Sequence, residues 1–344
     1  MSVERMLVVM PNWFGETLFA TPLLRALRQG RPEAWIAACG VARAEEVLIG
    51  NPCVNEFIRY DEDSPHPWVE QCHLIAELRA KRFDVAIVLR RSLTRTFMMQ
   101  QARIAKRIGF TNWKSGWLLT DRVRAPKGVM HKAHTYFKLL EPLGAVELPG
   151  CYEYVISEPE LRDARALLGR HGLPKAGQPV LVLHPGANWP HKRWPIERFA
   201  ELANRLSAQR ACAIVVTGTA DDLPMIQAMQ ALVTAPAVIL AGQTTLRQLA
   251  ACLTMADAVV AGDTGVLHLA AALRRRIVAL YGPTSPALTG PLGDPTRTIV
   301  LHHPDACPSI PCYSADDPPH AGMTTISVAE VERAVLQLLN QTSA

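Results

Sequence analysis

A carboxylate stands at the bend between the first apolar run of the chain and the helical pattern that follows it. In MPNWFGETLFATPLLRALR, residues 10–28, a strand-like run leads through Gly15 into an apolar helical segment, and Glu16 lies at the turn. A carboxylate there can take a proton from a substrate hydroxyl as a general base. It is also favoured in a first helical turn, where it meets the positive end of the helix dipole. The residues alone leave both roles open.

A second set of reactive residues follows a buried run in VVAGDTGVLHLAAAL, residues 259–273. Asp263 and Thr264 are residue types that start helices, and Gly265 permits close backbone approach. Free N–H groups at such a helix start attract a phosphate or a developing negative charge. Alternatively, Asp263 only caps the helix and His268 only sits in its first turns. The segment is neither a Walker loop nor a GxGxxG fingerprint, so a P-loop kinase or a dehydrogenase is unsupported.

Two further loops after apolar runs carry charged side chains. In HPGANWPHKRWPIERFAELANRL, residues 184–206, Lys192 can reach a diphosphate as a point charge, or it is an ordinary surface lysine. Trp194 beside it equally suits a domain core. In VVTGTADDLPMIQAM, residues 215–229, Asp221 and Asp222 can accept hydrogen bonds from ribose hydroxyls or cap the next helix. Both loops therefore offer groups to a nucleotide, with a structural role as the alternative.

Positive charge is concentrated in one part of the 344-residue chain. The net charge is +5, yet residues 81–138 hold 14 Lys and Arg against two Asp, which gives +12 locally and leaves −7 for the remainder. Such a field favours an anionic partner, namely a nucleic acid, a phosphorylated sugar or an acidic membrane surface, with a solvated basic face as the alternative. The region has no RNP, zinc-finger or helix-turn-helix signature, which argues against nucleic acid.

The composition indicates a soluble, reduced protein. Hydrophobic residues make up 49% of the chain, no run of about 18 apolar residues occurs, and no signal-peptide pattern opens it, so a cytoplasmic location is expected. The eight cysteines are scattered, several within apolar segments. Cys307 and Cys312, with His320 nearby, lack zinc-ribbon spacing, so no metal site is expected.

The elements that must position these residues alternate between apolar strands and helical patterns. The expected strands of the first half lie within residues 6–11, 34–40, 84–90 and 103–110, and those of the second half within 180–186, 213–218, 237–242, 257–263 and 276–283. This alternation predicts two doubly wound parallel sheets. The Pro- and Gly-bearing stretch 171–179 divides the chain into domains 1–170 and 171–344. Loops at the carboxyl ends of their strands are expected to face a central cleft.

Several segments resemble one family. Four segments resemble the second domain of the bacterial lipopolysaccharide heptosyltransferases, namely KRWPIERFAEL, VVTGTADD, LAGQTTLRQLAACLTMADAVVAGDTGVLHLAAAL and VALYGPTSP. These enzymes are inverting glycosyltransferases of family 9 with the GT-B fold. Their first strand, loop and helix are similar to residues 10–28, and the middle of their acceptor domain to RIGF and LLTDRV. The tail CPSIPCYSADDPPHAGMTTISVAEV resembles the ending of the heptosyltransferase II branch. The resemblance covers nearly the whole chain.

This resemblance implies a site for ADP-L-glycero-D-manno-heptose in the second domain. Lys192 and the helix start would hold the diphosphate, and Asp221 would lie near the ribose. Asp263 and His268 would lie toward the sugar. The implied donor-binding residues are Gly15, Lys192, Asp221, Thr244, Asp263, Thr264, Gly265 and His268. The C-terminal helix is a candidate to pack back on the first domain.

The resemblance also implies a direct displacement at the anomeric carbon that inverts configuration, releases ADP and uses no metal or other cofactor. Lys192 would stabilise the leaving diphosphate. The family has an Asp after Gly as the general base, and the matching residue here is Glu16 after Gly15. The extra methylene moves the carboxylate by about 1 Å, enough to affect the rate.

The basic segment acquires a role from the same resemblance. Inner-core acceptors carry carboxylates and phosphates, and the candidate acceptor-binding residues are Arg90, Arg91, Arg95, Arg107 and Lys132. Docking at the cytoplasmic face of the inner membrane would use the same charge. The alternatives are a related transferase with another nucleotide sugar or acceptor, and an ADP-sugar-binding protein that lost transfer through the change at Glu16. The oligomeric state stays open.

Overall fold

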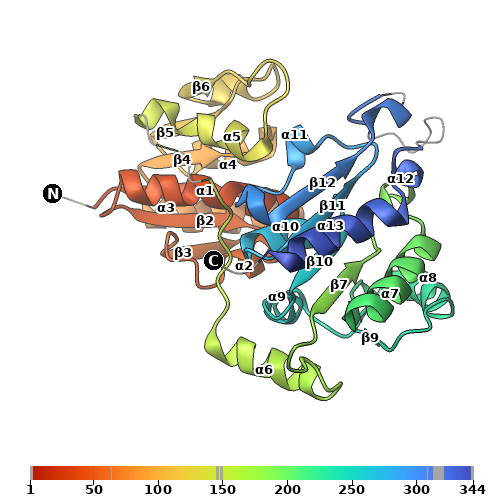
Figure 1. Cartoon of the computed structure of the whole chain (residues 1–344). Helices are drawn as coiled ribbons and strands as arrows, with labels where there is room; N and C mark the ends of the chain where they lie inside the picture. Colours follow the sequence, from red (N-terminus) through yellow and green to blue (C-terminus); the bar gives the residue numbers. More distant parts are fainter. Residues whose placement is uncertain are drawn as a thin grey trace. The chain divides into compact units, whose positions relative to one another are not determined.

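Two compact units make up the chain in the computed structural model, Met1–Val155 and Ile156–Ala344. The structure describes residues 3–62, 64–144, 147, 150–307, 309–312 and 321–341. Each unit is built on a parallel six-stranded sheet with helices packed against it (Figure 1). The α/β class with two doubly wound sheets is therefore confirmed.

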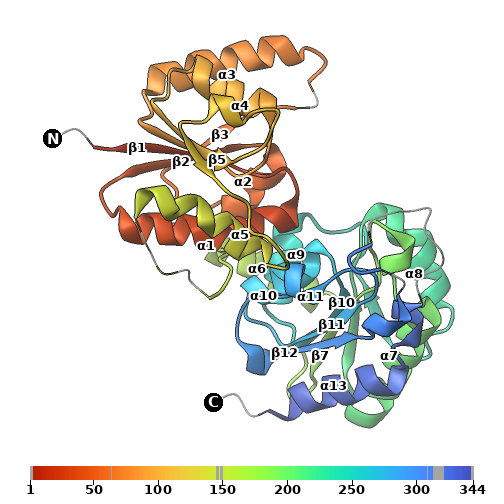
Figure 2. The ribbon, with the colours of Figure 1, turned by 90° about the horizontal axis from the view of Figure 1, so that it is seen from above.

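The sheet of the first unit has the order β3-β2-β1-β4-β5-β6. Its strands are β1 (Arg5–Val9), β2 (Trp35–Gly40), β3 (Glu56–Arg59), β4 (Val85–Val88), β5 (Lys106–Phe110) and β6 (Asp121–Val123). Its helices are α1 (Phe14–Gly30), α2 (Ala42–Leu48), α3 (Pro67–Lys81), α4 (Leu93–Gln101) and α5 (Lys132–Phe137), with short 3-10 turns η1 (Gly116–Leu118) and η2 (Lys138–Leu143). Helices α3 and α4 lie on one face of the sheet, and α1 and α5 on the other (Figure 2). The strand order reverses between β1 and β4, so the loops after these two strands flank the point where doubly wound sheets bind ligands.

The second unit repeats this plan with the order β12-β11-β10-β7-β8-β9. Its strands are β7 (Val180–His184), β8 (Ala213–Val216), β9 (Ala237–Ile239), β10 (Ala258–Gly262), β11 (Ile277–Tyr281) and β12 (Thr298–His302). Its α-helices are α6 (Glu158–Gly169), α7 (Ile196–Arg210), α8 (Leu223–Gln230), α9 (Leu246–Leu253), α10 (Gly265–Ala272), α11 (Pro286–Thr289), α12 (Gly322–Thr325) and α13 (Val328–Asn340). Its 3-10 turns are η3 (Pro190–Lys192), η4 (Ala220–Asp222), η5 (Pro295–Arg297) and η6 (Pro304–Ala306). Here the order reverses between β7 and β10, which puts the loops that follow them side by side.

The apolar runs form the core because parallel strands are covered on both faces. Every residue of β7, β10 and β11 is buried. Trp194 is also a core residue: its ring packs edge-on against Phe199, and its Nε1 donates to the Ile326 carbonyl at 2.9 Å. Trp194 therefore packs in the core of the second unit, which is the role that its sequence position also allowed.

Three strands and the domain boundary differ from the sequence-based expectation. Strands β3, β6 and β12 were not predicted, because they are short or partly exposed and lack a continuous apolar run. The division lies at 155/156 rather than 170/171, since α6 packs on α9 within the second unit. The last helix, α13, buries Val331, Val335 and Leu338 in the core of the second unit.

The cysteines, clusters of ionisable side chains and helix lengths of the described residues bear on metal binding and on membrane insertion. All eight cysteines are free, and five of them are buried. Within the described ranges, no three His, Cys, Asp or Glu side chains gather as metal ligands, and His320 lies outside those ranges. No helix of the described part has the length and apolarity needed to cross a bilayer.

Candidate active site

Asp263 is the centre of a buried polar cluster at the carboxyl end of β10. One carboxylate oxygen accepts a hydrogen bond from Lys192 Nζ at 3.0 Å. The other lies 3.5 Å from His268 Nε2 and 3.5 Å from the Tyr281 hydroxyl. The Asp263 side chain is only 8% exposed. The fold thus brings Lys192, Asp263 and His268 together, although 76 residues separate the first and last of them.

The electrostatics of the cluster keep Asp263 ionised. Burial raises the pKa of a carboxyl group. Here the hydrogen bond with His268 and the charges of Lys192 and His268 outweigh burial and hold the pKa of Asp263 well below its usual range. Asp263 is therefore a fixed carboxylate that orients the ammonium and the imidazole, and it is not available as a general acid.

The loop after β7 delivers Lys192 to this carboxylate. Lys192 is the last residue of the turn η3, and its Nζ lies 5.2 Å from the centre of the Trp189 ring. A Cβ on Gly262 would approach the Lys192 carbonyl to 3.0 Å, so glycine at the end of β10 lets this loop pack closely. Lys192 is mostly buried and paired. The alternative that it is an ordinary surface lysine does not fit this environment.

The N-terminus of α10 adjoins the cluster. Thr264 is the N-cap residue, but its side chain makes no capping hydrogen bond. Its hydroxyl is buried and has no hydrogen-bond partner within the described part of the chain. Because the first N–H groups of a helix have no partner inside the helix, they and this hydroxyl can bind an anion. Asp263 does not cap α10, since its carboxylate is taken by Lys192 and His268.

The loops after β8 and β9 hold the other predicted donor residues. Of Asp221 and Asp222, it is Asp222 that caps the turn. Its Oδ2 accepts hydrogen bonds from the Thr219 backbone N–H at 2.9 Å and from the Thr219 hydroxyl at 2.8 Å. Asp221 remains exposed, and Thr244 is half-buried just before α9. Both follow strands of the same edge as Asp263. In the described residues no hydrogen bond or ion pair joins them to the Asp263 cluster.

In the first unit, Glu16 lies in the first turn of α1, directly after Gly15. Its Oε1 accepts a hydrogen bond from Lys132 Nζ at 2.9 Å, and its side chain is 24% exposed. Lys132 opens α5, the helix that packs against α1. The neighbouring Tyr136 keeps its proton, because burial and then the charge of Glu16 raise the pKa of its hydroxyl. Glu16 is therefore an accessible, positioned carboxylate that also lies near a helix dipole.

The family follows from comparison with known proteins. Residues 72–314 match the model of glycosyltransferase family 9 (heptosyltransferase). The chain belongs to glycosyltransferase family 9. It is 31% identical over 313 residues to lipopolysaccharide heptosyltransferase 2 of Salmonella typhimurium, an alignment that covers 86% of this chain and 88% of that protein.

Solved structures agree with this assignment. A family 9 glycosyltransferase from Veillonella parvula has a TM-score of 0.87 at 25% identity, with 98% of each chain covered. The ADP-heptose lipopolysaccharide heptosyltransferase II of E. coli has a TM-score of 0.81 at 28% identity, with 97% of this chain and 98% of that chain covered. The fold of this family 9 chain is therefore GT-B, as the sequence resemblance implied.

Two of the five predicted acceptor-binding cations of this glycosyltransferase have a structural role. Arg95 is 3% exposed, its Nη1 donates to the Met10 carbonyl at 2.5 Å and its Nε to Glu62 at 3.0 Å. Arg107 donates from Nε to the Leu118 carbonyl at 2.8 Å, and burial lowers its pKa. These contacts hold nearby loops in place, with the Arg95 guanidinium buried and Arg107 half-buried. The predicted acceptor role of the two arginines stays a prediction.

The other three cations are accessible. Arg90 and Arg91 are exposed just after β4, and Arg91 lies 5.9 Å from the centre of the Phe110 ring. Lys132 is the partner of Glu16 and is itself partly exposed. Since β1 and β4 are neighbours, the loops that carry Glu16 and these arginines leave the same edge of the sheet. Arg90, Arg91 and Lys132 therefore remain the accessible candidates for binding an anion in the first unit.

Sequence reasoning missed two residues at the edge of the second sheet. Tyr281 ends β11, and its hydroxyl reaches both Asp263 and the Thr289 carbonyl, the latter at 2.8 Å. Thr284 follows in the next loop, with a buried hydroxyl that has no hydrogen-bond partner in the described part of the chain. Their position after the strand next to β10 was the available signal, because loops after neighbouring parallel strands share an edge.

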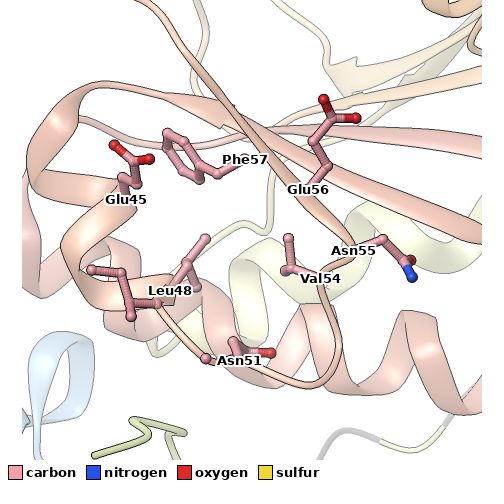
Figure 3. Close-up of a pocket in the computed structure, with 9 residues that line it drawn as sticks. Glu45, Leu48, Asn51, Val54, Asn55, Glu56 and Phe57 are labelled. Carbon is pink, nitrogen blue, oxygen red and sulfur yellow. The ribbon is translucent and has the colours of Figure 1, made fainter.

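A surface hollow in the first unit lies apart from these residues. It is lined by α2, β3 and the loop between them (Figure 3). Its carboxylates are occupied, since Glu45 pairs with Arg59 and Glu56 with Lys81. None of the predicted site residues lines it, so it has no part in the assignment of function.

Proposed function

We propose that this glycosyltransferase transfers heptose from ADP-L-glycero-D-manno-heptose to the inner core of lipopolysaccharide, with inversion and without a metal ion. The observation that carries the proposal is the Lys192–Asp263–His268 cluster beside the N-terminus of α10. It supplies a cation, unpaired N–H groups and a buried hydroxyl to an anionic donor. The similarity to the Salmonella lipopolysaccharide heptosyltransferase 2 and to the E. coli ADP-heptose enzyme supports the choice of donor and acceptor.

The donor diphosphate would bind between Lys192 and the start of α10. Lys192 offers its charge, and Thr264 and Gly265 offer a hydroxyl and N–H groups. These fixed donors stabilise the negative charge that develops on the diphosphate as it leaves, which is the task a metal ion performs in other enzymes. His268 would lie toward the sugar, oriented by Asp263, and Asp221, Thr244 and Gly15 complete the proposed donor contacts.

Glu16 would be the general base. The oxygen of the acceptor hydroxyl forms a bond to the anomeric carbon, the bond from that carbon to the diphosphate breaks, and its electron pair leaves with ADP. The hydroxyl proton passes to Glu16. Oε1 of Glu16 is held by Lys132, while no hydrogen bond to Oε2 is found in the described residues. A single displacement of this kind inverts the anomeric configuration.

The acceptor would be anionic and held by Arg90, Arg91 and Lys132. These cations lie at the same edge of the first sheet as Glu16, and guanidinium groups recognise phosphates and carboxylates through paired hydrogen bonds. In this proposal the enzyme works in the cytoplasm, at the membrane face that carries its acceptor.

A binding protein without transfer activity is the second candidate. The observation in its favour is the longer Glu at the place where the family has Asp, with its carboxylate already paired to Lys132. Both candidates bind ADP through the second unit, and only the transferase turns over.

The test is ADP release from ADP-heptose with a truncated inner-core acceptor, in EDTA. Glu16→Gln should lower kcat by about a hundredfold or more, the usual contribution of a general base. ADP affinity by calorimetry should stay unchanged, because Gln keeps the size of the side chain and lies outside the ADP site.

Lys192→Ala serves as the matched variant that should weaken ADP binding itself. One result would overturn the transferase proposal in favour of the binding protein. In that result the wild type binds ADP but turns over with no acceptor, while Glu16→Asp is active. Turnover that requires added Mg²⁺ would contradict the metal-free mechanism.

A further inference from the structure

Two exposed tryptophans lie in the turn between β5 and β6. Trp113 is 87% exposed and Trp117 is 66% exposed. Two exposed indole rings within five residues, each with an apolar body and a polar N–H, suit a surface that is apolar and polar at once. Neither ring belongs to the site described above.

The turn that carries these rings is firmly held. Asn112 Oδ1 accepts hydrogen bonds from the backbone N–H groups of Lys114 at 3.0 Å and Ser115 at 2.8 Å. Ser115, Leu118 and Leu119 are buried beneath it. The Trp117 Nε1 donates to the Lys114 carbonyl at 3.1 Å. The two rings are therefore presented by an ordered turn and are not exposed through looseness of the chain.

Exposed positive charge is concentrated in the sequence around the two rings. The exposed cations of residues 111–129 are Lys114, Arg122, Arg124 and Lys127, and Lys114 Nζ lies 5.0 Å from the centre of the Trp113 ring. The single carboxylate of this stretch, Asp121, accepts from the Thr120 hydroxyl and lies 3.7 Å from Lys106. No ion pair within the described residues engages the four cations. We call residues 111–129 the Trp-basic segment.

The Trp-basic segment flanks the acceptor edge of the first unit. Phe110 at the end of β5 pairs in register with Val123 at the end of β6, so residues 111–114 and 124–129 both leave the carboxyl edge of the sheet. Arg91, after β4, reaches the Phe110 ring at the same edge. Strand β6 is the last strand of the sheet (Figure 1).

We propose that the Trp-basic segment docks this unit on an anionic phospholipid bilayer. Tryptophan rings settle at the level of lipid headgroups, where the apolar ring is buried and the N–H stays near polar groups. Lysine and arginine beside them are attracted to anionic headgroups. The exposed Val129 adds apolar surface to the same stretch. The inference deepens the proposed function, and rests on it for its purpose, because an acceptor carried by a membrane must be reached at the bilayer surface.

Vesicle flotation of the full chain, without donor or acceptor, tests lipid binding by itself. Vesicles of phosphatidylcholine with about a third phosphatidylglycerol should float the wild type, and pure phosphatidylcholine should float much less. Lys114→Gln, Arg124→Gln and Lys127→Gln together should weaken binding by roughly fivefold per charge, an effect reduced by salt. Trp113→Ser with Trp117→Ser should weaken it at least tenfold on the same vesicles, since both interfacial rings are lost.

Matched controls lie elsewhere on the chain. Trp68→Ser removes another exposed tryptophan of the same unit. Arg162→Gln, Arg165→Gln and Arg170→Gln together remove three exposed charges from α6 and the C-cap residue that follows it. Both should float like the wild type. Flotation of the double Trp variant at the wild-type level would overturn the docking proposal.

Activity separates docking from recognition of the acceptor itself. With a water-soluble truncated acceptor, the double Trp variant should keep wild-type kcat and KM, whereas with acceptor embedded in vesicles its KM should rise. An equal rise of KM with the soluble acceptor would mean that the rings stack on acceptor sugars, which overturns docking. If the wild type floats with the vesicles but transfers heptose to no acceptor, the proposed function is wrong, while the finding that the segment binds lipid still holds.

Discussion

At the scale of single residues, His184 gives the stability of the second unit a pH dependence. It ends β7, next to the loop that carries Lys192, and its Nδ1 lies 3.0 Å from the Thr217 hydroxyl. Complete burial lowers its pKa to about 4, although the charge of Asp222 and a hydrogen bond with Thr217 act in the opposite direction. The folded protein therefore holds this imidazole neutral at a pH where the unfolded chain protonates it.

The sign follows from that difference. The unfolded state takes up the proton near pH 6.5 and the folded state near pH 4, so the stability from His184 is full above pH 6.5 and is lost as the pH falls toward 4. We expect a loss of roughly 3 kcal/mol in the free energy of unfolding across this window. His184→Asn should remove this slope, as measured by urea unfolding at a series of pH values. His171→Asn, at an exposed histidine, is the control, and a slope that persists in His184→Asn would contradict the assignment.

Residue types after strands predicted that Lys192, Asp263 and His268 lie together, but they did not predict which basic side chains of the first unit are buried. Lys192, Asp263 and His268 could be found because each follows or ends a recognisable apolar strand. Arg95 and Arg107 could not be separated from Arg90 and Arg91, because a guanidinium is buried or exposed according to which carbonyls the folded chain gathers around it. That information lies in tertiary structure and not in the spacing of charges.

At the scale of elements, Gly186 allows the loop after β7 to pack against the turn after β8. A Cβ on Gly186, just after β7, would stand 2.5 Å from Asp222 Oδ2, and Asp222 caps the turn η4 before α8. The loop that delivers Lys192 and the turn that follows β8 are thus in direct contact.

Gly186→Ala should therefore destabilise the protein by about 1–3 kcal/mol, the usual cost of overpacking. It should also weaken ADP binding, because the displaced loop carries Lys192. Urea unfolding and calorimetry measure the two effects. Gly169→Ala, where a Cβ meets nothing within 4 Å, is the matched control and should be neutral or slightly stabilising. Wild-type stability in Gly186→Ala would contradict the packing argument.

The elements themselves were predictable where burial is complete on both faces. All nine predicted strands are present, and the helix patterns between them hold. The missed strands have polar or exposed positions, as in the three-residue β6, and gain their hydrogen bonds only from a neighbouring strand. The predicted domain boundary lies too late in the chain because the Pro- and Gly-bearing stretch 171–179 resembles a linker. In the structure, Arg247 of α9 pairs with Glu160 of α6, with Nε and Oε1 2.6 Å apart, so α6 belongs to the second unit.

At the scale of the whole molecule, the proposed reaction uses residues from both units. Glu16 belongs to the first and Lys192 to the second. If both act on one displacement, their effects on kcat are coupled, because loss of either already prevents the shared transition state.

A double-mutant cycle tests this coupling. The fall in kcat for Glu16→Gln with Lys192→Ala should be clearly smaller than the product of the two single falls, measured by ADP release under saturating donor. Glu16→Gln with Trp68→Ser provides the additive control. A strictly multiplicative loss in the first pair would argue that the two residues serve separate steps.

The pairing of Lys192 with Asp263 affects which anions can bind at this site. Before a donor arrives, the ammonium already has an internal counter-ion, so the second unit does not present a bare positive charge to the cell. Orthophosphate, nucleotide monophosphates and other abundant small anions must compete with that carboxylate for Lys192. We expect a ligand to replace Asp263 as the partner of Lys192 with a net gain in binding free energy only when it also contacts the start of α10. We therefore expect this site to favour a pyrophosphate, which reaches both Lys192 and the start of α10, over smaller anions that reach Lys192 alone.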